Sequence, residues 1–195
     1  MSTSPLIALL PARAYRAMPW RNGLGTTTEI AVEPGADGRF HWRLSIADVA
    51  QSGPFSSFDG YDRTIAVVAG AGMRLAVDGR PTVLIDQGSA PHDFPGDAAT
   101  DCRLIDGPIR DFNLIVDRAT ARGRVVGLSA TSSITLDGGT ALLHALKGGF
   151  TLDAGAFGAC MVPEGDTLRL DGLTGTVSIS GPDDGRALLA TILRR

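Results

Sequence analysis

The sequence predicts an all-β protein built from two related halves. The chain has 195 residues, among them 25 glycines and 11 prolines, and its apolar residues fall into short runs. Glycine and proline are typical of tight turns, and short apolar runs between turns are typical of strands. The third observation is an internal repeat at a spacing of 77 residues, as between Gly72 and Gly149. A hydrophobic fraction of 44% is enough for one substantial core or two small ones.

The strand candidates follow one another with turn residues between them. Leu6–Leu10 is the expected first strand. The others in the first series are Thr27–Glu33, Phe40–Ala47, Thr64–Ala69, Met73–Asp78, Thr82–Asp86, Cys102–Ile105 and Phe112–Asp117. The second series comprises Arg124–Leu128, Ala141–Leu146, Phe150–Asp153, Gly158–Val162, Thr167–Leu170, Thr176–Ser180 and Ala187–Leu193. Two alternatives stay open: a helical turn over Asp117–Arg124 and a short helix over the last segment.

The repeat aligns the two series strand by strand. A shift of 77 places Ile65 on Leu142, Ala69 on Leu146, Gly72 on Gly149, Leu75 on Leu152 and Gly88 on Gly165. The ordered spacing favours a duplication, with the two halves divided near residues 118–124. The same shift places Asp62 and Arg63 on Gly139 and Thr140. A polar site is therefore expected in the first half, and the second half is expected to supply packing or an interface.

Charge and cysteine content narrow the class of protein. The formal net charge is −3 and the sequence pI is near 5.5, so no basic surface for nucleic acid is expected. No apolar stretch is long enough to span a membrane, and membrane association is not expected. Cys102 and Cys160 lie far apart and form no CxxC pair, which predicts two reduced thiols and a cytoplasmic protein.

The run Pro19–Ile30 is the strongest candidate for a binding loop. Trp20, Arg21, Asn22 and Glu29 bring an aromatic plane, a guanidinium, a carboxamide and a carboxylate together just before and within a strand. The run has no histidine or cysteine for a metal and no nucleophile beside a base, so it favours binding over catalysis. Plain structural roles stay open: Trp20 as an apolar plug, Asn22 in a turn and Glu29 facing solvent.

Further candidates lie on the strands that follow. In Phe40–Ile46 the alternation puts Arg43 and Ser45 on the face opposite the apolar side chains. Asp62 and Arg63 stand at the entrance of the next strand, and Asn113 begins a later one after a Gly-Pro turn. Two guanidiniums at the mouth of a small barrel would match a carboxylate. The competing interpretation pairs each arginine with a local acid, namely Asp48, Asp59 or Asp62.

Several ordered blocks resemble the HutD/Ves family of bacterial proteins. They are PWRNGLGTTTEI, FHWRLSIADVAQSGPFSSFDGYDRTIAVVAGAG, DFPGD and IDGPIRDFNLIVDR, and together they span roughly Pro19 to Arg118. The resemblance implies a bicupin, which is two small β-barrels of the double-stranded β-helix type in one chain. We expect the ligand-carrying barrel over residues 1–120 and a smaller cupin-like barrel over 121–195. The chain has Arg21 and Leu24 where family members commonly have Lys and Gly, which leaves the ligand open.

Many cupins hold a metal through an HxH motif, and the sequence does not favour one here. His41, His92 and His144 are the only histidines, and none forms such a pair, so neither a metal nor another cofactor is expected.

The resemblance also implies a link to histidine utilisation. Members of the family are thought to bind a small pathway metabolite and to limit operon output. The predicted function is therefore non-enzymatic binding of a small carboxylate metabolite, such as urocanate, at Trp20, Arg21, Asn22, Glu29, Arg43, Ser45, Asp62, Arg63 and Asn113. The alternative is a metal-independent isomerase or hydrolase for a sugar or amino-acid derivative, with Glu29, Asp62 or His92 as acid or base. A purely structural or partner-binding module and a homodimer also stay open.

Overall fold

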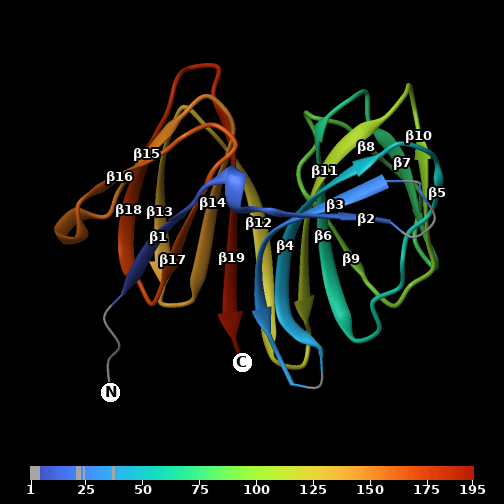
Figure 1. Cartoon of the computed structure of the whole chain (residues 1–195), viewed down its shortest axis with the longest axis horizontal. Helices are drawn as coiled ribbons and strands as arrows, with labels where there is room; N and C mark the ends of the chain where they lie inside the picture. The colour runs from blue at the N-terminus through green and yellow to red at the C-terminus, as the bar shows by residue number, and fades with distance from the viewer. Residues whose placement is uncertain (1–4, 21–22, 24, 37) are drawn as a thin grey trace. The chain divides into compact units, whose positions relative to one another are not determined.

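The chain forms two compact all-β units (Figure 1). The computed structural model describes residues 5–20, 23, 25–36 and 38–195. One unit, here called the N-terminal unit, comprises residues 15–123 with Arg195. The other, the C-terminal unit, comprises the chain up to residue 14 and residues 124–194. In the described residues the helical segments are two 3-10 turns, Ala12–Ala14 and Gly155–Phe157, and none is long enough to cross a membrane.

The N-terminal unit contains two antiparallel sheets. The larger has the strand order β2-β3-β4-β11-β6-β9, and the smaller has the order β5-β10-β7-β8. Their bounds are β2 Arg16–Pro19, β3 Gly25–Pro34, β4 Phe40–Val49, β5 Gly53–Pro54, β6 Tyr61–Ala69, β7 Met73–Val77, β8 Val83–Ile85, β9 His92–Pro95, β10 Thr100–Leu104 and β11 Ile109–Asp117. The core of this unit draws buried side chains from both sheets, including Val49 and Ile65 from the larger and Leu75 and Cys102 from the smaller.

The C-terminal unit repeats this plan. Its sheets have the orders β1-β17-β14-β19-β12 and β13-β18-β15-β16. Their bounds are β1 Leu6–Leu10, β12 Ala121–Ser129, β13 Thr131–Asp137, β14 Thr140–Lys147, β15 Phe150–Asp153, β16 Ala159–Val162, β17 Thr167–Asp171, β18 Thr174–Ser180 and β19 Arg186–Arg194. β9-β6-β11-β4 matches β17-β14-β19-β12, and β8-β7-β10-β5 matches β16-β15-β18-β13, in the same order of neighbours. The strand pairing therefore confirms the repeat.

The 77-residue spacing holds in the smaller sheets and slips by one residue in the larger ones. Leu75 pairs with Cys102, and Leu152 pairs with Ile179, each 77 residues further on. In the larger sheets each copy has a β-bulge, where Ala69 and Val67 face consecutive residues of β11 as Lys147 and Ala145 face consecutive residues of β19. Aligning the bulges pairs β6 with β14 at a spacing of 78.

The same alignment pairs β11 with β19 at a spacing of 76, since Asp111 faces Val67 and Ala187 faces Ala145. A slip of one residue turns a side chain to the other face of a sheet. The counterpart of Arg63 is therefore Ala141, and the predicted match with Thr140 is wrong.

Several predicted elements change in the structure. β1 pairs with β17, so the first residues belong with the C-terminal unit and the expected range 1–120 does not describe one unit. The helix considered over 187–193 is strand β19, and the helical turn considered over 117–124 is a turn that leads into β12. Four further strands, β2, β5, β9 and β13, are not among the predicted ones. β9 is short and ends at Pro95, so it lacks the length and the alternation by which strands are recognised.

Candidate functional site

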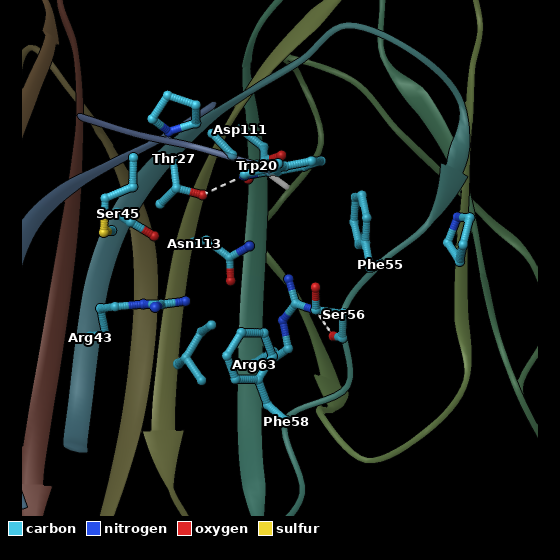
Figure 2. Close-up of a pocket in the computed structure, with 15 residues that line it drawn as sticks. Trp20, Thr27, Arg43, Ser45, Phe55, Ser56, Phe58, Arg63, Asp111 and Asn113 are labelled. Atoms are coloured by element: carbon cyan, nitrogen blue, oxygen red, sulfur yellow. Dashed lines mark hydrogen bonds between the residues drawn. The ribbon is translucent and has the colours of Figure 1, made fainter. Parts of the chain in front are cut away.

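The N-terminal unit holds a cavity of about 410 Å³ between the larger sheet and the chain that follows β5 (Figure 2). It lies at one end of the core, where polar side chains replace the apolar ones of β4, β6 and β11. The lining residues are Met18, Pro19, Trp20, Thr27, Arg43, Ser45, Ala47, Pro54, Phe55, Ser56, Phe58, Arg63, Asp111, Asn113 and Ile115. All of them belong to one unit, so its two sheets and their connecting loops build the whole site.

Arg63 is a buried cation in this cavity. It is 5% exposed, and its guanidinium carbon lies 4.8 Å from the ring centre of Phe94, 5.3 Å from that of Phe58 and 5.4 Å from that of Phe55. Its Nη1 donates a hydrogen bond to the Ser56 carbonyl at 3.3 Å, while its Nε has no partner. Burial lowers the pKa of Arg63 to about 10, so the group stays charged at neutral pH. The aromatic rings contribute cation–π attraction but satisfy no N–H of the guanidinium.

Arg43 offers a second guanidinium from β4, which is separated from β6 by β11. Its guanidinium carbon lies 5.1 Å from the ring centre of Phe40 and 5.3 Å from that of Phe58, so the Phe58 ring contacts both arginines. The Nε of Arg43 is also buried without a partner. Burial lowers the pKa of Arg43, and the negative charge of Glu29 acts in the opposite direction. Two cations with unused donors therefore face one cavity.

Asp111 and Asn113 add two acceptors from β11. They are 1% and 7% exposed, and the Oδ1 atom of each has no hydrogen-bond partner. Burial raises the pKa of Asp111 to about 7, against the opposing effects of the Arg63 charge and a hydrogen bond with Asn113. Since β-strand side chains alternate, these residues two positions apart lie on the same face. On this face of β11, Asp111 and Asn113 contribute polar groups to the cavity wall.

Trp20 lines one side of the cavity, and two hydrogen bonds fix its position. Its indole Nε1 donates to Thr27 Oγ1 at 2.8 Å, and its backbone N–H donates to the Gly25 carbonyl at 2.9 Å. A Cβ on Gly25 would collide with the Asp48 carbonyl oxygen and would approach the Trp20 ring to 3.1 Å. Glycine is therefore required at residue 25 for the indole to lie against the chain. Because the indole N–H is already used, Trp20 offers a ligand its ring.

Five of the predicted site residues line this cavity: Trp20, Arg43, Ser45, Arg63 and Asn113. The prediction of a polar face on the strand from Phe40 is confirmed by Arg43 and Ser45, which lie on the cavity side. Arg21 and Asn22 fall outside the described residues. Glu29 does not line the cavity, although its negative charge acts to raise the pKa of Arg43.

Asp62 lies away from the cavity, which corrects its grouping with Arg63. It is exposed and accepts a hydrogen bond from Arg118 Nε at 3.0 Å. Neighbouring residues on a strand point to opposite faces, so Asp62 and Arg63 cannot both enter one cavity. The local acids proposed as partners of the two arginines are engaged elsewhere. Asp48 pairs with Arg110 at 2.8 Å, and Asp59 accepts a hydrogen bond from Ser57 at 2.6 Å.

The sequence analysis missed Asp111, Thr27 and the aromatic residues Phe55 and Phe58. The predicted strand begins at Phe112 and leaves Asp111 outside it, whereas β11 already begins at Ile109. Counting back two residues from Asn113 along a strand would have put Asp111 on the same face. The two phenylalanines follow β5 in irregular chain, where no periodicity marks their direction.

The three histidines lie in separate places. His41 Nδ1 is 2.9 Å from Thr120 Oγ1, the His92 ring stacks on Phe94 with centroids 6.4 Å apart, and His144 Nδ1 is 2.9 Å from Thr167 Oγ1 in the C-terminal unit. Within the described part of the chain, no three His, Cys, Asp or Glu side chains are grouped so as to hold a metal ion.

Comparison with solved structures supports this fold. The structure of HutD from Pseudomonas fluorescens SBW25 has a TM-score of 0.84 and 36% sequence identity, and the match covers 97% of this chain and 100% of that one. A cupin 2 conserved barrel domain protein from Leptotrichia buccalis has a TM-score of 0.54 at 10% identity, over 88% of this chain and 89% of that one. This second likeness is one of fold alone, and it identifies the architecture as cupin-like.

Sequence comparison gives the family. A protein of 21.2 kDa from the hutC 3′ region of Pseudomonas putida is 41% identical over 171 residues, which cover 85% of this chain and 87% of that protein. Protein Ves of Citrobacter koseri is 35% identical over 162 residues, covering 80% and 84% of the two chains. The HutD family model matches residues 12–188. The chain therefore belongs to the HutD family.

Proposed function

We propose that this protein binds a small carboxylate metabolite in the cavity of its N-terminal unit and does not transform it. One observation carries the proposal: Arg43 and Arg63 are both desolvated in the same cavity, and each keeps an Nε–H without a partner. A buried donor without an acceptor costs about 1 to 3 kcal/mol. A carboxylate between the two guanidiniums would supply the missing acceptors and the opposite charge.

The relatives suggest where this metabolite arises. One relative is named for the hutC 3′ region, and a similar structure is named HutD, both of which refer to histidine utilisation genes. We therefore propose a histidine-degradation intermediate, with urocanate as the first candidate. The cavity volume of about 410 Å³ is within the range of small-molecule sites. Binding would modulate histidine utilisation by sequestering the metabolite or through a partner protein.

Isothermal titration calorimetry with urocanate and other carboxylates of the pathway tests the proposal. Wild-type protein should bind at least one of them, and Arg63→Ala should weaken that binding by about 2 to 5 kcal/mol, because the ligand loses a desolvated charge-assisted contact. Arg110→Ala is the matched control, since it removes an exposed arginine of the same unit that pairs with Asp48. Absence of binding, or equal affinity for wild type and Arg63→Ala, would disprove the proposal.

Asp111 favours a second candidate function, a metal-independent isomerase or hydrolase. A carboxyl group whose pKa is raised to about 7 inside a ligand-sized cavity is suited to proton transfer at neutral pH. This function predicts that purified protein converts one of the same carboxylates and that Asp111→Asn stops the conversion. Proton NMR of the ligand over several hours with stoichiometric protein would reveal the product. Unchanged spectra would remove this candidate.

We further propose that each unit is a small cupin barrel, which makes the chain a bicupin. The repeated two-sheet plan and the likeness to a cupin barrel protein support this. Both cysteines are free, which supports a cytoplasmic location, where thiols stay reduced.

A further inference from the structure

The cavity contains unused acceptors as well as unused donors. Asp111 Oδ1 and Asn113 Oδ1 have no hydrogen-bond partner although both side chains are more than nine-tenths buried. Buried polar groups in folded proteins are nearly always paired, so unpaired ones facing a cavity indicate what the cavity binds. A carboxylate alone supplies no donor, so it would leave Asn113 Oδ1 unsatisfied, and Asp111 Oδ1 as well whenever Asp111 is ionised.

Donors and acceptors occupy different parts of the cavity. In the view of Figure 2, the guanidinium groups of Arg43 and Arg63 flank its middle, where Asn113 lies, and Asp111 is drawn toward Trp20. Asp111 and Arg63 are close enough for each charge to shift the pKa of the other. Even so, Asp111 Oδ1 and Arg63 Nε are both unpaired, so the two groups do not satisfy each other.

Two polar groups near the acceptors are already engaged in other hydrogen bonds. The Trp20 indole N–H is donated to Thr27, and Asn113 is hydrogen-bonded to Asp111. Neither Asp111 Oδ1 nor Asn113 Oδ1 receives a hydrogen bond from any described residue. A hydroxyl group of a ligand would need a donor for its own oxygen, whereas a planar N–H group needs an acceptor only. The acceptor pair is thus better matched by N–H than by O–H.

We propose that the cavity selects carboxylates that also carry an N–H group, with the carboxylate held by Arg43 and Arg63 and the N–H donated to Asn113 Oδ1, beside Asp111. This inference rests on the proposed function, because it assumes that the two arginines bind a carboxylate. It adds the requirement that the ligand carries an N–H group away from its carboxylate, so the ligand class is defined by both groups. The flat ring of Trp20 beside the acceptors suits an amide or a heterocyclic ring as the carrier of the N–H.

A pair of ligands that differ in one atom tests the requirement. 3-(Pyrrol-2-yl)acrylate has a ring N–H, and 3-(furan-2-yl)acrylate has an oxygen in its place with nearly the same shape. By calorimetry, wild-type protein should bind the pyrrole at least tenfold more tightly than the furan. Discrimination of this size is usual when a buried polar group is left unpaired by the wrong ligand.

Two variants assign the discrimination to the acceptor end. Asn113→Leu should reduce the pyrrole-to-furan affinity ratio to less than threefold, and it introduces the residue found at the matching position, Leu189, of the C-terminal unit. Thr100→Ala should keep the full ratio, because Thr100 is buried in the same unit but does not line the cavity.

The outcomes separate this inference from the proposed function. If both ligands bind with equal affinity to the wild type, or if Asn113→Leu keeps the ratio, the N–H requirement is wrong and carboxylate binding stands. If no carboxylate binds, including urocanate, the proposed function fails and the inference fails with it. The comparison of the two ligands on wild-type protein decides even if Asn113→Leu does not fold.

Discussion

The Asp111 carboxyl group connects the site to protein stability at the level of a single residue. Its pKa is raised from 3.8 to about 7 by burial, so the folded chain holds this proton between about pH 4 and pH 7 while the unfolded chain releases it. Linkage then requires the free energy of unfolding to fall as pH rises through this window, by at most about 1.4 kcal/mol per pH unit.

Asp111→Asn should remove this contribution. Relative to wild type, the variant should gain roughly 3 kcal/mol of stability between pH 4 and pH 7. Urea unfolding of the ligand-free proteins at several pH values measures the difference. Ser45→Ala, a buried change without a titrating group, should follow the pH dependence of wild type. A variant-to-wild-type difference that stays constant with pH would show that Asp111 is ionised throughout.

At the scale of elements, the segment between β2 and β3 depends on Gly25. Gly25→Ala should displace the Trp20 ring, because a Cβ there collides with the Asp48 carbonyl and crowds the indole. We expect a loss of about 1 to 3 kcal/mol of stability and at least fivefold weaker ligand binding. Denaturant unfolding and calorimetry report the two effects. Gly127→Ala is the control, since no atom lies within 4 Å of its added Cβ, and it should change neither quantity.

The strands also show how far sequence alone reaches. Alternation along β4 correctly placed Arg43 and Ser45 on one face and Trp42 and Leu44 on the other. This was possible because polar and apolar residues alternate in the sequence as the side chains alternate between the two faces. The same alternation argues against a binding site that contains the side chains of both Asp62 and Arg63, because adjacent strand residues point to opposite faces. Three residues lie between β6 and β7 but only two between β14 and β15, so an alignment at a fixed spacing of 77 is out of register by one residue at β6. The order of β1 beside β17 depends on long-range pairing, which local patterns do not encode.

For the whole molecule, the location of the cavity in one unit predicts that stability and binding can be separated. Leu152 in the C-terminal unit and Leu75 in the N-terminal unit are repeat counterparts, and both are fully buried. Each Leu→Ala change should cost about 2 to 5 kcal/mol of unfolding free energy. Only Leu75→Ala should also weaken ligand binding. Calorimetry at a temperature where both variants are folded gives the comparison, and a tenfold loss in Leu152→Ala would contradict it.

The two copies of the larger sheet carry different chemistry at equivalent positions. In the bulge alignment, the counterparts of Arg63, Asp111 and Asn113 in the repeat are Ala141, Ala187 and Leu189. These three apolar residues are buried in the core of the C-terminal unit. The repeat therefore indicates which substitutions to exchange between the units. Placing the three apolar residues in the N-terminal unit would remove the polar side chains that face the cavity. Placing the three polar residues in the C-terminal unit would test whether they are sufficient to create a binding site.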